Sequence, residues 1–214
     1  MITISEHVFG EMENDPDGFC IKIREVMQED YGLYIWPCSI ALAEYVWQQR
    51  HRFVGTTVLE LGAGTALPGI VASKVGANVT LTDRSDANEV FENMMETTAL
   101  NGANCKIQSL TWGEFDESLF NLEVPNIILG ADVLYESKDF DDLFATVSFL
   151  LHDDPEAVFI TTYQRRSGHR LIEYLVAKWN LRCTKLIDAF SFMPCHKEYS
   201  LSVSIELVEL QCQM

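Results

Sequence analysis

Two carboxylates and a pair of glycines are the first residues whose types and spacing indicate chemistry. Glu60 and Asp83 each end a short run of apolar and β-branched residues, and Gly62 and Gly64 follow Glu60 directly. Glycine has no Cβ, so it permits a sharp turn and the close approach of a ligand to the backbone. A carboxylate about 20 residues after such a turn can accept hydrogen bonds from the hydroxyls of a ribose. The pattern predicts a nucleotide-like ligand, with a plain tight turn as the alternative.

The residues after the glycines narrow the class of ligand. Dinucleotide sites have a third small residue where this chain has Leu67, so a pyrophosphate is disfavoured. No Lys-Ser or Lys-Thr pair follows the glycines, which excludes a P-loop. A ligand with an amino-acid end and an adenosine end, but no phosphate, suits acidic residues at both 60 and 83. S-adenosylmethionine is a ligand of this kind.

Asp132 and Tyr135 are the candidates for chemistry on an acceptor. They follow a predicted buried strand at 124–129, and open α/β sheets bind ligands beyond the carboxyl ends of their strands. A nitrogen that attacks a sulfonium methyl must be oriented, and positive charge develops on it. A carboxylate can orient the nitrogen and stabilise this charge. The structural alternative is that Asp132 forms a turn and Tyr135 packs beneath the cofactor.

The elements that must position these residues alternate between strands and helices. Apolar runs predict strands at 57–59, 78–82, 105–110, 124–129, 157–162, 182–187 and 201–210. Helical spacing predicts helices from Thr65, at 39–49, from an Asp86 cap to 100, at 140–151 and at 169–179. No long helix separates the last two strands, so we expect them to pair as an antiparallel hairpin. The predicted fold is α/β, with a seven-strand, doubly wound, Rossmann-like sheet that is mostly parallel and has this hairpin at its C-terminal edge.

Four motifs resemble those of one family. They are ELGAGTALPG with the Thr-Asp pair at 82–83, GLYIWPCSIALAEYV at 32–46, TWGE at 111–114 and GADVLYE at 130–136. Their order is similar to that in the seven-strand protein methyltransferases known as methyltransferase family sixteen. The resemblance implies S-adenosylmethionine as cofactor and methyl donor. It also implies an acceptor that is usually a lysine of a chaperone, a translation factor or another protein.

The resemblance also implies roles for individual side chains. Trp36, of the Trp-Pro pair, would line the cofactor cavity, and Trp112 would lie beside the adenine, where an indole can stack. A core aromatic residue is the alternative for each. The Asp-x-x-Tyr of Asp132 and Tyr135 would border the acceptor site. The predicted cofactor-binding residues are Trp36, Glu60, Gly62, Ala63, Gly64, Asp83, Trp112 and Ala131, the predicted catalytic residues are Asp132 and Tyr135, and no metal site is predicted.

The charge balance bears on the partner. The chain has 214 residues, enough for one α/β domain, and a formal net charge of −17. Negative charge repels a phosphate backbone and attracts cationic proteins. We therefore expect a basic protein of the histone, chaperone or translation factor class as partner, and no nucleic acid. The alternative is that the acidity serves solubility alone.

Domain organisation and location follow from simpler patterns. Phe19, Ile21 and Ile23 alternate as in a strand, so residues 1–31 are predicted to be an arm or hairpin packed on the core, and residues 32–214 the methyltransferase domain. Six cysteines without a Cys-x-x-Cys pair favour free thiols in the cytoplasm, the nucleus or both. No apolar run reaches the length of a membrane span, so no membrane partner is expected. A monomer is expected.

The predicted function is S-adenosylmethionine-dependent transfer of a methyl group to a lysine or arginine nitrogen of a basic protein, such as a histone or chaperone. The alternatives are a small-molecule methyltransferase, a non-catalytic module that binds the cofactor, and a nucleic-acid methyltransferase. The last class needs an aromatic residue after a short Asn/Asp-Pro-Pro element to stack the target base. This chain has Asp-Val-Leu-Tyr at the corresponding position, 132–135, which disfavours it.

Overall fold

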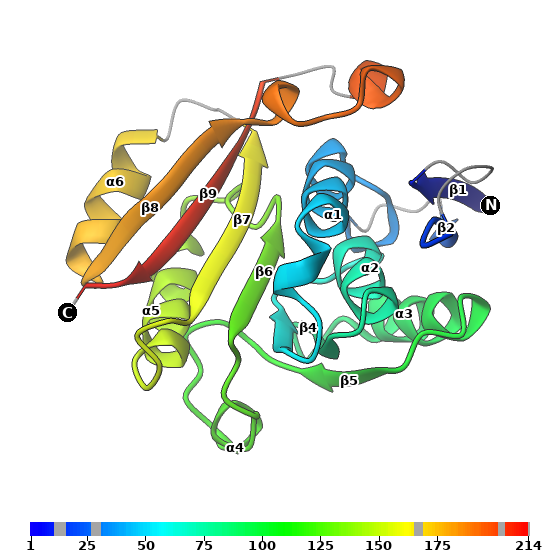
Figure 1. Cartoon of the computed structure of the whole chain (residues 1–214). Coiled ribbons are helices and arrows are strands. Elements are labelled where there is room, and N and C mark those ends of the chain that lie inside the picture. The colour runs from blue at the N-terminus through cyan, green and yellow to red at the C-terminus, as the bar shows by residue number, and fades with distance from the viewer. Residues whose placement is uncertain (11–15, 27–30, 165–168, 201–203, 214) are drawn as a thin grey trace.

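A computed structural model describes residues 1–10, 16–26, 31–164, 169–200 and 204–213. Its main feature is a seven-stranded sheet between two layers of helices (Figure 1). The strands of this sheet are β3 (Thr57–Glu60), β4 (Asn78–Asp83), β5 (Cys105–Ser109), β6 (Ile127–Ala131), β7 (Val158–Gln164), β8 (Leu181–Asp188) and β9 (Ile205–Cys212). The α-helices are α1 (Pro37–Gln48), α2 (Leu67–Lys74), α3 (Asn88–Leu100), α4 (Glu117–Phe120), α5 (Phe140–Leu151) and α6 (His169–Lys178). Residues 201–203 of the last predicted strand lie outside the described residues.

The strand order in the sheet is β5-β4-β3-β6-β7-β9-β8. The strands from β5 to β7 are parallel, and β9 pairs antiparallel with both β7 and β8. The predicted antiparallel pairing of the last two strands is therefore confirmed, with β9 inserted between β7 and the edge strand β8. β4 and β6 flank β3 on opposite sides, so the winding of the chain reverses at β3. Ligands of open α/β sheets bind at such a switch point.

Alternation along the strands divides the core between the two faces of the sheet. Ile127 and Leu129 of β6 pack in a cluster with α1, α2 and α3, whereas Ile128 packs in a second cluster with α5 and α6. Strands buried on both faces have nearly continuous apolar sequences, as β6 does. The predicted doubly wound fold is confirmed.

A two-stranded antiparallel sheet, β1 (Ile2–Phe9) and β2 (Phe19–Val26), packs outside α3. Ile23 of β2 is fully buried in the first core cluster. Asn93 of α3 and Asn101, the C-cap of α3, bond to the backbone of β2. The Asn101 amide accepts from Lys22 N (2.8 Å) and donates to Lys22 O (2.7 Å), and Asn93 Nδ2 donates to Arg24 O (3.0 Å). These bonds satisfy backbone groups along β2 that β1 does not reach and fasten the hairpin to the helix. The domain boundary at residue 31 remains a prediction.

Two helices begin later than predicted. Helix α3 starts at Asn88 with Ala87 as N-cap, and Asp86 forms an ion pair with Arg84 (Nε to Oδ1, 3.0 Å) instead of capping the helix. Helix α2 starts at Leu67 because its N-cap, Ala66, has a left-handed φ of 61°. Within the described ranges, no helix has both the length and the apolar character needed to cross a membrane.

Candidate active site

A cavity of about 1050 Å³ is lined by residues that follow β3, β4, β5 and β6, at the switch point of the sheet. Its lining residues come from five segments, at 32–39, 62–65, 83–90, 110–114 and 131–142. This volume is at the upper end of the range for sites that enclose small molecules. The cavity therefore has room for a cofactor together with an acceptor side chain.

The turn after β3 depends on glycine at two positions. Gly62 and Gly64 have φ values of 57° and 53°, which side chains other than glycine rarely adopt. A Cβ at Gly62 would lie 3.0 Å from Cζ2 of Trp112, and a Cβ at Gly64 would lie 3.1 Å from the carbonyl oxygen of Gly32. The sequence predicted that a ligand approaches these glycines. In the structure, Trp112 packs against Gly62 and the backbone of Gly32 packs against Gly64, so packing within the chain also requires these glycines.

The Asp83 carboxylate lies beside the glycine turn, as its spacing from the glycines predicted. Its Oδ2 accepts a hydrogen bond from Gly64 N (3.0 Å), and its Oδ1 accepts one from Arg84 N (2.9 Å). Asp83 also lines the cavity. A carboxylate has about four acceptor sites, so Asp83 can hold the turn and still accept hydrogen bonds from a ligand.

Glu60 does not line the cavity, which corrects its predicted role as a cofactor-binding residue. Successive side chains of a strand face opposite sides of the sheet, and Glu60 faces α2. The side chain is 1% exposed, and its Oε2 accepts a hydrogen bond from Gly69 N in the first turn of α2 (2.9 Å). Burial raises the pKa of Glu60 to about 8, against the opposing effect of the Gly69 N–H; the nearby Asp83 charge raises it further. Glu60 joins β3 to α2.

Trp36 and Trp112 both line the cavity from different loops. Trp36 is the N-cap of α1, and its ring meets the ring of Tyr34 edge to face, with 5.5 Å between centroids. Trp112 follows β5 and is partly buried against the second core cluster. Both indole rings therefore border the cavity, and Trp112 also contributes to the core. Ala63 and Ala131 line the same cavity.

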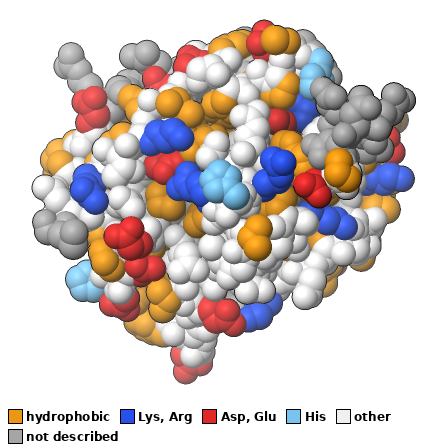
Figure 2. Space-filling model, viewed as in Figure 1, with side chains coloured by type: hydrophobic (Ala, Val, Ile, Leu, Met, Phe, Trp, Pro, Cys, Tyr) orange, Lys and Arg blue, Asp and Glu red, His pale blue; other side chains and the backbone are white. Residues whose placement is uncertain are grey.

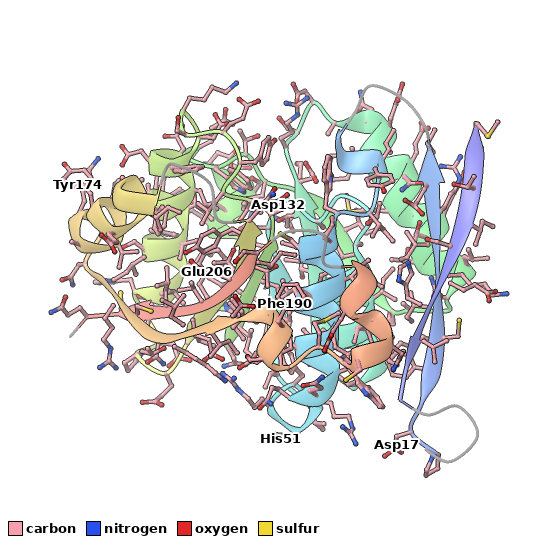
Figure 3. The ribbon with its side chains drawn as sticks, turned by 90° about the horizontal axis from the view of Figure 1, so that it is seen from above. Asp17, His51, Asp132, Tyr174, Phe190 and Glu206 are labelled. Atoms are coloured by element: carbon pink, nitrogen blue, oxygen red, sulfur yellow. The ribbon has the colours of Figure 1, made fainter. Side chains whose placement is uncertain are left out.

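Asp132 and Tyr135 follow β6 and line the cavity. Asp132 has a left-handed φ of 53°, and its backbone N donates to Thr162 O (2.8 Å). Figure 3 shows Asp132 in the central part of the molecule, seen from above. Partial burial raises the pKa of the Tyr135 hydroxyl, with further contributions from the charges of Glu136 and Asp139. The structure brings together nine of the ten predicted residues, with Glu60 as the exception.

Four further carboxylates at the cavity were not predicted as site residues. This acidic rim consists of Glu114, Glu136, Asp139 and Asp142. The two cations in the described lining pair with acids, Lys138 with Glu136 (2.6 Å) and Arg84 with Asp86 (3.0 Å). The rim therefore has an excess of negative charge. Two of its members stand inside the TWGE and GADVLYE motifs, a signal that could have identified them.

The fold and the site define a class of protein. A seven-stranded sheet of this order, with a glycine turn after β3 and a carboxylate at the end of β4, is the architecture of S-adenosylmethionine-dependent methyltransferases. A solved structure of this class, an S-adenosylmethionine-dependent methyltransferase from Clostridium acetobutylicum ATCC 824, has the same fold with a TM-score of 0.61 and 12% sequence identity. That likeness covers 81% of this chain and 92% of the solved one.

Residues 15–175 match a family described as lysine methyltransferase, and the chain belongs to this family. The resemblance inferred from the four motifs is confirmed, and S-adenosylmethionine is the cofactor. The chain is 44% identical over 167 residues to the histone-arginine methyltransferase METTL23 of Xenopus laevis, which covers 78% of this chain and 71% of that protein. It is 38% identical over 133 residues to the protein N-lysine methyltransferase METTL21A of Mus musculus, which covers 61% of each chain.

Proposed function

We propose that this chain methylates an arginine side chain of a basic protein such as a histone. The observation that carries the proposal is the acidic rim around a cavity that also contains Asp132, because a cationic side chain is the acceptor that such an opening attracts. Arginine is put first because relatives named histone-arginine methyltransferases are 38–44% identical to the chain in four vertebrates.

The residues around the cavity fit S-adenosylmethionine. The backbone of Gly62, Ala63 and Gly64 would hold its amino-acid end, and Asp83 would accept the ribose hydroxyls. Trp36, Trp112 and Ala131 offer apolar surface for the rest of the molecule. When bound, the cofactor supplies a methyl group on a sulfonium, which is already electrophilic. The chain needs to supply alignment and charge stabilisation rather than activation of the donor.

Asp132 is proposed to act on the acceptor nitrogen. That nitrogen would form a bond to the methyl carbon as the methyl–sulfur bond of the donor breaks, and positive charge would increase on it during attack; its proton would then pass to solvent water. The Asp132 carboxylate would orient the nitrogen and stabilise this charge. Tyr135 lines the same cavity, and its hydroxyl would add a hydrogen bond and its ring an aromatic surface beside the acceptor.

Lysine is the second candidate acceptor. The family description and the METTL21A relatives support it, since both carry lysine in their names. A carboxylate can accept two parallel hydrogen bonds from a guanidinium but meets an ammonium as a point charge. Arginine and lysine would therefore interact with the Asp132 carboxylate in different ways, arginine through both oxygens and lysine as a point charge.

The test is a methylation assay with labelled S-adenosylmethionine and purified core histones, followed by hydrolysis and separation of methylarginine from methyllysine. We expect label in methylarginine. Label in methyllysine alone would replace the arginine proposal with the lysine one, and histones without label would contradict a histone substrate. We further propose a location in the cytoplasm or nucleus, supported by the free thiols of all six cysteines.

A further inference from the structure

Three phenylalanine rings form an exposed cluster on the side of the molecule that carries α5. This phenylalanine strip consists of Phe115, Phe120 and Phe149, which are 46%, 60% and 41% exposed. Phe149 meets both of the others edge to face, with ring centroids 5.4 Å from Phe115 and 5.7 Å from Phe120. Single exposed apolar residues are common, but a contiguous group of aromatic rings in water is a mark of an interaction site.

The strip is continuous with the rim of the cavity. Asp142 of the acidic rim and Phe149 are seven residues apart on α5, so they lie on the same side of the helix, about 10 Å apart along its axis. Glu114 of the rim directly precedes Phe115. A surface that starts at the acidic rim thus becomes aromatic within two helical turns.

The loop that carries Phe115 is hydrogen-bonded to α5. Gly113 N donates to Thr146 Oγ1 (2.9 Å), and Thr146 Oγ1 in turn donates to Asp142 O (2.9 Å). A Cβ at Gly113 would lie 2.7 Å from the Asp142 carboxyl carbon, so only glycine permits this approach. After the loop, Asp116 caps α4 by accepting from Ser118 N (2.9 Å). The strip is therefore preorganised, which lowers the entropic cost of binding a partner.

We propose that the phenylalanine strip binds the segment of the protein substrate that flanks the methylated residue. The inference rests on the proposed function. The acidic rim would attract the cationic residue that is methylated, and the phenylalanine strip would bind an apolar side chain that flanks it in the substrate. About 10 Å corresponds to roughly three residues of extended chain. The substrate would carry a large aliphatic or aromatic side chain at least three residues from the cationic residue that meets the rim.

The experiment compares intact substrate with one too short to reach the strip. Phe120→Ser and Phe149→Ser proteins are assayed on purified core histones and on a five-residue arginine peptide. We expect kcat/KM on histones to fall about 10-fold, through KM, as for an aromatic anchor of an interface. Turnover of the short peptide and the calorimetric Kd of S-adenosylmethionine should stay within about twofold of wild type, since neither ligand reaches the strip.

Tyr174→Ser is the matched control. Tyr174 is 62% exposed on α6, and Figure 3 shows it at the periphery, away from Asp132. This substitution removes an exposed aromatic ring without touching the strip, and its KM on histones should equal that of wild type. Circular dichroism and thermal unfolding establish that each variant is folded.

Three results would overturn the inference. Folded Phe120→Ser and Phe149→Ser proteins with wild-type KM on histones would remove the strip from substrate binding and leave the proposed function intact. A wild-type dimer that Phe120→Ser converts to a monomer, seen by light scattering, would assign the strip to a second copy of the chain. If wild-type and Tyr174→Ser proteins neither bound nor methylated histones, the proposed function itself would fail, and the docking surface with it.

Discussion

Asp132 combines a strained backbone with a place in the cavity lining. A φ of 53° is uncommon outside glycine, and asparagine and aspartate adopt it more readily than other residues. Strain of this kind persists where the surrounding structure enforces it, and here Asp132 N is held by Thr162 O (2.8 Å). An asparagine can replace Asp132 without new strain. Asp132→Asn therefore separates charge from conformation.

We expect Asp132→Asn to keep the fold and the S-adenosylmethionine Kd while kcat falls about 100-fold, as when other preorganised electrostatic groups are removed. Single-turnover kinetics and calorimetry measure the two effects. Tyr135→Phe should cost less, because the ring remains. A guanidinium acceptor should lose more than an ammonium, since only the guanidinium uses both carboxylate oxygens. If Asp132→Asn had the turnover of wild type, the carboxylate would have no role in the reaction, and Asp132 would serve only to form the turn.

Glu60 makes the stability of the protein depend on pH. Its pKa is about 8 in the folded state against an ordinary value of 4.5, and burial is the main cause. Between these two pH values the folded chain keeps a proton on Glu60 that the unfolded chain has released. The unfolded state is therefore favoured progressively as pH rises from about 5 to about 8.

Glu60→Gln removes this titration and keeps an oxygen that can accept from Gly69 N. We expect the free energy of unfolding of the variant to exceed that of wild type at pH of about 8, with the difference shrinking toward pH 5 at roughly 1 kcal/mol per pH unit. Urea unfolding at several pH values measures the difference, and the contributions of other titrating groups cancel. Parallel curves for the two proteins would show that Glu60 does not titrate in this range.

At the scale of elements, the N-terminal hairpin is linked to the cofactor cavity by residues 31–36, which help to line the cavity and are hydrogen-bonded to β2. The N-terminal strap, residues 31–36, begins with a 3₁₀ helix (Tyr31–Leu33), contributes Gly32, Tyr34 and Trp36 to the cavity and approaches the glycine turn at Gly64. Glu25 of β2 accepts a hydrogen bond from Ile35 N in the strap (3.2 Å). The hairpin thus holds the strap over the turn.

Glu25→Ala should raise the S-adenosylmethionine Kd about 5- to 10-fold, the loss of roughly one charge-assisted hydrogen bond. Glu25→Gln should restore the affinity, because its amide oxygen can still accept from Ile35 N. The control is Asn101→Ala, which breaks the bonds from the C-cap of α3 to Lys22, leaves the bond from Ile35 N to Glu25 in place, and should lower stability without changing the Kd. If all three variants bound the cofactor equally, the strap would be held by its other contacts.

At the scale of the whole molecule, the net charge of −17 bears on how a cationic substrate is attracted. On the face shown in Figure 2, Lys and Arg side chains lie among Asp and Glu side chains rather than on a continuous acidic surface. The acidic rim, in contrast, gathers four carboxylates at one opening. A cationic substrate should therefore be attracted more strongly to the opening of the cavity than to the face shown in Figure 2.

We expect the KM for core histones to rise several-fold between about 0.1 M and about 1 M salt, as the Debye length falls from about 10 Å to about 3 Å. The Kd of S-adenosylmethionine should change little, because this ligand binds inside the cavity. Steady-state kinetics over a salt series, with calorimetry in the same buffers, measure both. A histone KM that did not change with salt would assign the acidity to solubility.

The sequence by itself determined the parts of this protein that depend on short-range pattern. The glycine turn between Glu60 and Leu67 could be identified because glycine adopts positive φ angles more readily than other residues, and Asp83 because consecutive parallel strands end at the same edge of the sheet. The buried strands and the antiparallel last pair followed from hydrophobic period and connection length. These signals are local, so a single sequence contains them.

Tertiary structure alone decided which side chains share a surface. Glu60 and Asp83 both end strands, yet Glu60 is buried against α2 while Asp83 lines the cavity, because the facing of a strand residue depends on the helix that covers it. The acidic rim and the phenylalanine strip each draw on the loop after β5 and on α5, separated by some 25 residues of chain. Sequence distance carries no information about such contacts, whereas the winding of the sheet brings these segments together at one end of the molecule.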